Sequence, residues 1–165
     1  MNSVEKINTR RSIRKYKDEP VPEEVMHSIL EAGRLSPSAV NRQPWHFVVV
    51  KDQKIKEAIY HERYSRFIKD ADFTVVGLYL PSEALTEKLS LVDVTIALQS
   101  MVIAAWMQDI GSCWIGGFNE EKLKKTLNLP EESKIVCLVS FGVPDEEPAQ
   151  RPKKSMNEII HYDKW

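Results

Sequence analysis

Two short apolar runs and one helical pattern organise the first half of the chain. The runs 46–50 (HFVVV) and 73–80 (FTVVGLYL) are continuous and rich in β-branched residues, as is typical of buried strands. Between residues 22 and 35 the apolar positions recur at helical spacing, behind Pro22 at a favourable first helical position. Pro37 disfavours helical geometry at the residue before it. We therefore expect a helix that ends by Leu35, then a loop, then a buried strand.

One long apolar helix dominates the second half of the chain. Between Leu91 and Met107 only four side chains are clearly polar, namely Asp93, Thr95, Gln99 and Ser100. A helix that is apolar nearly all round is expected to be buried nearly all round, here as the central helix, in the fold or against a second subunit. Asp93 and Gln99 argue against a membrane span, which needs about 20 apolar residues. Gly111 is the expected C-cap.

Shorter elements complete the expected chain. Residues 3–9 suit a short helix, 112–115 (SCWI) an extended piece, and 134–142 (KIVCLVSFG) a further buried strand. Asn119 is an expected N-cap, and Ser155 with Glu158 resembles a capping box. The chain is thus expected to be one α/β-type domain over residues 1–165, in which 145–165 form an extended C-terminal arm.

Composition and charge exclude several classes of protein. The chain has 165 residues, 42% of them hydrophobic and 28% charged, which suits one folded domain. Its formal net charge of -1 argues against a nucleic-acid binder. The N-terminus lacks the apolar segment of a signal peptide, so a cytoplasmic location and no membrane partner are expected. No metal site is expected, because ligand spacing is absent among Cys113, Cys137, His27, His46, His61 and His161.

Four segments carry the candidate chemistry: RRSIR (10–14), PSAVNRQPW (37–45), GSCWIGG (111–117) and RPKK (151–154). Each alone is commonly a solvated basic face, a loop or a turn. Together they supply what a phosphate-bearing aromatic cofactor requires: cations for the phosphate, glycines for close backbone approach, and amides for the polar ring edge. Neither a P-loop nor a dinucleotide fold is indicated, because the chain lacks both glycine-rich fingerprints.

The order, spacing and residues of these segments resemble those of the FMN-dependent nitroreductase family. The similarity runs from TRRSIRKY (9–16) to RPKKSMNEIIHYDKW (151–165), which is nearly the whole chain. It implies an α+β fold: a three-layer α–β–α sandwich with a central mixed, mainly antiparallel sheet, and a C-terminal arm exchanged in a homodimer. It also implies FMN at the dimer interface and NADH or NADPH as the reductant.

The resemblance assigns site residues position by position. Arg10 and Ser12 correspond to phosphate and ribityl contacts, and Arg14 corresponds to the cation beside the flavin N1–O2 edge. Gly116 corresponds to the position whose backbone N–H faces flavin N5. The segment that reaches the flavin from the other subunit corresponds to Pro37, Ser38 and Ala39. The other expected cofactor-binding residues are Arg11, Asn41, Gln43, Ile115, Gly117, and the late phosphate cations Arg151 and Lys153.

The implied activity is ping-pong hydride transfer through flavin N5 to nitroaromatics, quinones or similar small acceptors. No side chain is expected to be catalytic, and Arg14 and Gly116 are expected to tune the flavin. Two departures from the family pattern stand out: Asp109 lies where relatives commonly have Gly, and the 81–90 segment is short where larger relatives carry a lid. Two alternatives remain open, an FMN-binding or sensing protein without general turnover and a specialised flavin enzyme on the same scaffold.

Overall fold

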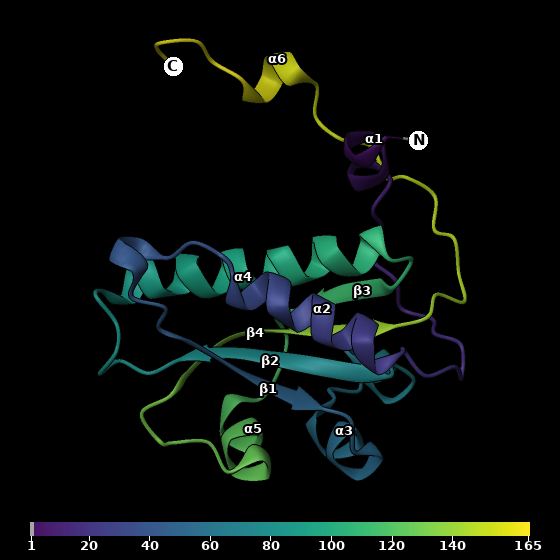
Figure 1. Ribbon diagram of the computed structural model, residues 1–165, viewed down its shortest axis with the longest axis vertical. Helices are drawn as coiled ribbons and strands as arrows, with labels where there is room; N and C mark the ends of the chain where they lie inside the picture. Colours follow the sequence, from purple (N-terminus) through teal and green to yellow (C-terminus); the bar gives the residue numbers. More distant parts are fainter. Residues whose placement is uncertain (1) are drawn as a thin grey trace.

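A four-stranded sheet forms the centre of the computed structural model, which describes residues 2–165 (Figure 1). Its strand order is β1-β2-β4-β3, and all three strand pairs are antiparallel. Among the described residues the only parallel pairing is the isolated bridge between Ser12 and Ser112, so the sheet of one chain is less mixed than expected. The strands are β1 (Trp45–Val50), β2 (Phe73–Tyr79), β3 (Gly111–Ile115) and β4 (Lys134–Gly142).

Helices cover both faces of the sheet, which confirms the expected α–β–α sandwich (Figure 1). On one face lie α2 (Glu23–Arg34) and α4 (Glu87–Met107), and their core includes Phe73 and Met101, which are fully buried. On the other face lie α3 (Gln53–Ile59) and α5 (Glu120–Leu127). The hydrophobic residues therefore fill two layers, one on each side of the strands.

The short elements begin where capping residues allow. Asn119 accepts a hydrogen bond from Lys122 N–H and starts α5, as expected. The expected capping box of Ser155 and Glu158 is confirmed, although Pro22 is the N-cap of α2 and not its first helical residue. The remaining elements are α1 (Ser3–Asn8), η1 (Ala39–Asn41), η2 (Arg66–Lys69) and α6 (Met156–Ile159).

The C-terminal arm leaves the body of the molecule. It runs past α1 and ends far from the sheet (Figure 1). Every residue from Arg151 to Trp165 is exposed, including Tyr162 at 85% and Trp165 at 102%. The large apolar side chains of the arm are therefore not covered by any other part of residues 2–165.

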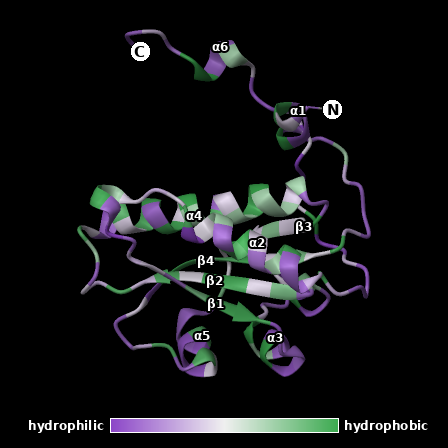
Figure 2. Ribbon diagram, in the orientation of Figure 1, coloured by the Kyte–Doolittle hydropathy of each residue, from purple (hydrophilic) through white to green (hydrophobic). Residues whose placement is uncertain are grey.

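The expectation that α4 is buried nearly all round was wrong for the single chain. Its inner face, with Val94 and Met101, packs on the sheet, whereas Leu91 and Val92 are 49% and 45% exposed. The ribbon of α4 is hydrophobic at several turns along its length (Figure 2). Among the described helices only α4 has the length and composition of a membrane span, but its inner face belongs to the core. The outer face of α4 is thus apolar as well, and no other part of the described chain covers it.

The expected role of Gly111 as a helix C-cap was also wrong. The helix α4 ends at Met107, and the left-handed residue after it is Asp109, with φ of 61°. Gly111 is the first residue of β3, and a Cβ atom there would lie 2.8 Å from Cγ1 of Ile13. The glycine is required because the N-terminal segment packs directly on its backbone.

Replacing Asp109 by Gly should raise the free energy of unfolding by about 0.5–1 kcal/mol, because a left-handed conformation is costly for a residue with a Cβ atom. The substitution also removes an ion pair between Lys6 Nζ and Asp109 Oδ1 at 2.9 Å, but an exposed pair contributes less than about 1 kcal/mol. Urea denaturation measures the change. Asp109→Asn is the control for the ion pair, because it removes the charge and keeps a side chain at the left-handed position, whereas Lys6→Met would also remove the hydrogen bond from Lys6 Nζ to the Met107 carbonyl at 3.0 Å. If Asp109→Gly were less stable than Asp109→Asn, backbone strain at Asp109 would be refuted.

Candidate cofactor-binding site

An extended segment, residues 10–16, crosses the start of β3 and positions the first group of predicted site residues. Ile13 N–H donates to the Ser112 carbonyl at 2.9 Å, and the Ile13 side chain is 1% exposed. Arg10, Ser12 and Arg14, on either side of Ile13 in the sequence, line one cavity and are not buried. The buried isoleucine thus anchors the segment that carries these three polar residues.

The two basic segments meet in space, as the sequence predicts. A cavity of about 360 Å³ is lined by residues from the N-terminal segment and from the arm. Within residues 2–165 none of its five cations forms an ion pair. Cations without ion pairs that line one cavity favour the binding of an anion with several acceptor oxygens, such as a phosphate. The five are Arg10, Arg11, Arg14, Arg151 and Lys153.

Arg11 differs from the other four cations. Its guanidinium donates to the carbonyls of Thr9 at 2.8 Å and Arg10 at 3.0 Å, and more weakly to that of Asn8 at 3.4 Å. It also donates to Gln150 Oε1 at 3.2 Å. Arg11 therefore closes the C-terminal end of α1 and joins it to the arm, and fewer of its donors remain for a ligand.

The glycine pair after β3 lies next to open space. Ile115 is buried at the end of the strand, whereas Gly116 is exposed and a Cβ atom there would meet nothing within 4 Å. At Gly117 a Cβ atom would lie 3.2 Å from Cδ2 of Tyr64. A planar ligand could therefore approach the backbone at Gly116, and Tyr64 closes the space at Gly117.

Sequence reasoning missed two aromatic residues at this site, Tyr64 and Phe67. The Arg14 guanidinium lies 6.0 Å from the centre of the Phe67 ring, and the Tyr64 ring packs on Gly117. Tyr64 and Phe67 belong to one short segment. This segment therefore contacts both Arg14 and the glycine pair, which places them around one site. The sequence signal was weak: their segment, YHERYSRF, has no periodic pattern that predicts which side chains face inward.

The polar loop that contains Pro37, Ser38, Ala39, Asn41 and Gln43 does not join this cluster within one chain. It lies against the N-terminal half of α4 (Figure 1). There Ala39 N–H donates to Asp93 Oδ1 at 3.0 Å. From Asp93 to the end of α4 is about 20 Å of helix. The cation cluster lies beyond that end, beside β3.

Backbone strain marks the same loop. Val40, Asn41 and Gln43 have φ of 53°, 55° and 51°, a conformation that disfavours residues with a Cβ atom. Val40 is 82% exposed, so its own packing does not hold this conformation. The carboxylate of Asp93, which is 4% exposed, and the Ser38 hydroxyl, which accepts from Gln43 N–H at 2.9 Å, hold the loop instead.

Cys113 lies beneath the cation cluster but is not a nucleophile. Burial raises the pKa of its thiol, and the nearby charges of Arg14 and Arg10 oppose that rise only in part. The thiol is therefore neutral near pH 7. Among residues 2–165 no three His, Cys, Asp or Glu side chains gather closely enough to hold a metal ion.

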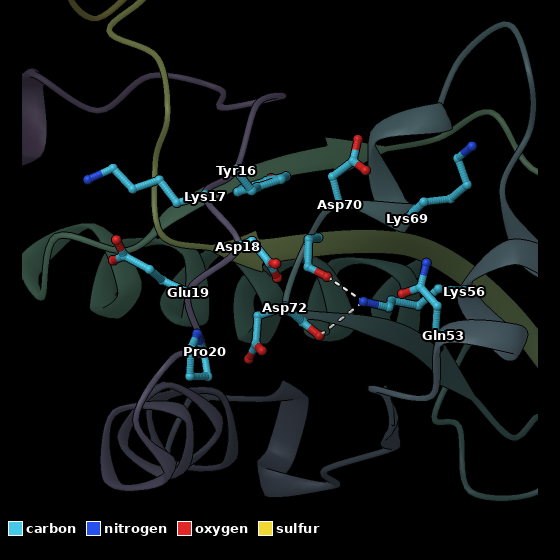
Figure 3. Close-up of a pocket in the computed structure, with 11 residues that line it drawn as sticks. Tyr16, Lys17, Asp18, Glu19, Pro20, Gln53, Lys56, Lys69, Asp70 and Asp72 are labelled. Atoms are coloured by element: carbon cyan, nitrogen blue, oxygen red, sulfur yellow. Dashed lines mark hydrogen bonds between the residues drawn. The ribbon is translucent and has the colours of Figure 1, made fainter.

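A second cavity, of about 450 Å³, lies between residues 16–20 and 69–72 (Figure 3). None of the predicted cofactor residues lines it, and its side chains carry charges of both signs. Lys56 is 6% exposed, and its Nζ donates to the carbonyls of Ala71 at 2.6 Å and Asp72 at 3.5 Å (Figure 3). Lys56 therefore connects α3 to the start of β2, and we assign it a structural role.

The stability that Lys56 provides should depend on pH. Burial lowers the pKa of Lys56 below 10.5, and Asp72 and Asp70 offset this only in part. Between the lowered folded pKa and 10.5 the unfolded chain binds more protons, so the stability of the wild type rises with pH across this window. Urea unfolding from neutral pH to pH 10.5 should show the wild type gaining stability relative to Lys56→Met. Lys54→Met, on the exposed side of α3, controls for the loss of one lysine, and parallel curves for wild type and Lys56→Met would refute the effect.

Comparison with known proteins finds relatives over the whole molecule. The sequence model described as the Nitroreductase family matches residues 7–71 and 60–143. A protein of Methanothermobacter thermautotrophicus, provisionally named NADH dehydrogenase/NAD(P)H nitroreductase, is 34% identical, and the match covers 100% of this chain and 88% of that protein.

Solved structures agree with this similarity. A Desulfovibrio desulfuricans protein, solved in complex with FMN, has a TM-score of 0.89 and 27% identity. The match covers 100% of this chain and 98% of that protein. A nitroreductase family protein of Clostridium novyi has a TM-score of 0.81 and 31% identity. The match covers 100% of this chain and 95% of that protein. The likeness therefore includes both layers of helices and the segments that build the site.

Proposed function

Since this chain belongs to the nitroreductase family, we propose that it binds FMN and uses NADH or NADPH to reduce small electrophilic acceptors such as nitroaromatics or quinones. The observation that carries the proposal is the cluster of cations without ion pairs, brought together from both ends of the chain. The FMN complex of the Desulfovibrio desulfuricans relative supports the choice of cofactor.

The residues present fit FMN at both ends of that ligand. Arg10, Arg151 and Lys153 offer charged donors for the phosphate, and Ser12 lines the same cavity. The open space at Gly116 suits a flat ring lying against the backbone. Arg14, which lies against Phe67, would place its charge beside the N1–O2 edge.

When bound, FMN supplies an N5 atom that takes a hydride from NADH or NADPH and passes it to the acceptor. With FMN bound, the Arg14 guanidinium would stabilise negative charge at the N1–O2 edge, and the Gly116 N–H would donate to N5. No acid–base side chain is assigned to the transfer, and the buried Cys113 thiol, whose pKa is raised by burial, is not a candidate. Reductant and oxidant then use the same open face beside Gly116 in turn, which is a ping-pong sequence.

We also propose that the functional unit is a homodimer. A groove of about 640 Å³ on the outer side of α4 is lined mainly by apolar atoms, with Ile96 and Ile103 among its residues. The exposed arm offers Tyr162 and Trp165 to cover a partner. In this arrangement the Pro37–Gln43 loop of one copy, remote from its own cations, serves the cofactor of the other.

Arg10→Ala should weaken FMN binding about tenfold or more, because one charge-assisted hydrogen bond contributes about 1.5–3 kcal/mol. Fluorescence titration of the apoprotein with FMN measures the dissociation constant. Lys125→Ala, exposed on α5, is the control for the loss of one positive charge. Equal affinity of the two variants would remove Arg10 from the phosphate site, and a wild type that takes up no FMN would refute the proposed function.

Ile96→Asp should shift the protein from dimer to monomer, or leave it poorly folded, since it places a charge on the apolar face of α4. Sedimentation equilibrium at micromolar concentration gives the mass. Lys122→Asp, on the opposite face of the sheet, should remain dimeric. A wild type that sediments as a folded monomer would contradict the homodimer.

A further inference from the structure

The turn that places Tyr64 on Gly117 is tightly built. Tyr64 N–H and Ser65 N–H donate to the His61 carbonyl at 3.1 and 2.9 Å, and His61 N–H donates to Ser65 Oγ at 2.8 Å. Arg63 N–H donates to His61 Nδ1 at 3.2 Å. Ser65 is 1% exposed and Ile68 is fully buried, so the turn is anchored in the core. Its exposed side chains are therefore presented from a fixed base.

Those side chains form a stack at the rim of the cofactor site. The ring centres of His61 and Tyr64 are 4.8 Å apart, and the Arg63 guanidinium lies 5.3 Å from the centre of the Tyr64 ring. Arg63 is exposed and, within residues 2–165, forms no ion pair. A guanidinium that lies over a ring keeps the N–H groups along its edge free to donate.

Arg66 lies in the same segment and provides a natural contrast. It is also exposed, and across the described part of the chain it has neither an ion pair nor an aromatic ring beneath its guanidinium. The two arginines therefore carry the same charge, but only the Arg63 guanidinium lies over Tyr64, the ring that packs on Gly117.

We propose that Arg63, supported by Tyr64, binds a phosphate group of the nicotinamide dinucleotide and makes this turn the recognition wall for the reductant. The inference rests on the proposed function, because it places the reductant on the open face beside Gly116. NADH and NADPH carry phosphates, whereas quinones and nitroaromatics need not carry a charge. One cation at the rim then favours the reductant without favouring the acceptor that follows it on the same face.

The kinetic test compares Arg63→Gln with Arg66→Gln in the FMN-loaded protein. Anaerobic stopped-flow reduction is measured with NADH, with NADPH, and with N-benzyl-1,4-dihydronicotinamide, a hydride donor without phosphate. Arg63→Gln should raise the dissociation constants of NADH and NADPH about tenfold, the loss expected for one charge-assisted hydrogen bond. Its reduction by the benzyl compound should be unchanged, and Arg66→Gln should match the wild type with all three donors.

A binding measurement that involves no hydride transfer completes the test. ADP-ribose carries the phosphates without the nicotinamide, and its binding to the wild type and both variants is followed by titration calorimetry. Arg63→Gln should bind it about tenfold more weakly than the wild type, and Arg66→Gln equally well.

Three results would overturn the assignment of Arg63: equal effects of the two substitutions, no effect of Arg63→Gln on ADP-ribose binding, or slower reduction of Arg63→Gln by the benzyl compound. Failure of the proposed function has a different signature, since the wild type would then take up no FMN or would not be reduced by the benzyl compound. The ADP-ribose titration still decides for or against Arg63 in that case.

Discussion

The contact between Ile13 and Gly111 is the constraint from which the site follows. The isoleucine is buried over a residue without a side chain, and its N–H bonds to Ser112. This contact anchors the segment that carries Arg10 and Arg14, both of which line the cavity. The arm then completes the cavity with its own cations. A larger residue at position 111 would displace the whole segment, although no charged group is altered.

The length of α4 divides the predicted site between its two ends. The strained Pro37–Gln43 loop is held by Asp93 near one end, and the cations gather beyond the other. In the proposed dimer, one chain would therefore carry two partial walls about 20 Å apart along the helix. Strain in an exposed loop is typical of a segment that is held for a function. The uncovered apolar face of α4 between the two walls gives a physical reason for a second copy.

Much of the fold could be predicted from the sequence because its signals are local. The β-branched runs identified β1 and β2, and the side chains of Asn119 and Ser155 identified the starts of α5 and α6. The prediction that Gly111 caps α4 was wrong for two reasons. The left-handed residue after the helix is an Asp, and the glycine instead allows Ile13 to pack closely on its backbone. The apolar pattern of α4 could not distinguish a face buried in its own chain from one that its own chain leaves exposed.

The site was predictable only as far as the resemblance reached. The basic segments meet as expected, but Tyr64 and Phe67 join them through tertiary contacts that no spacing in the sequence encodes. The hydrogen bonds from Arg11 to backbone carbonyls at the end of α1 could not be predicted from the sequence either. They depend on where the segment leaves the helix. Residues presented by irregular turns need the folded structure before a role can be assigned to them.

Subunit mixing tests most directly whether each cofactor site combines the cations of one chain with the loop of another. One variant loses the cation wall (Arg10→Ala with Arg14→Ala), and a second loses the loop (Ser38→Trp with Asn41→Trp). Neither homodimer should hold FMN. After co-refolding in equal amounts, random pairing leaves one intact site in half of the dimers, so FMN binding should recover to roughly a quarter of the wild-type stoichiometry. No recovery from a mixture shown to contain heterodimers would contradict the shared site.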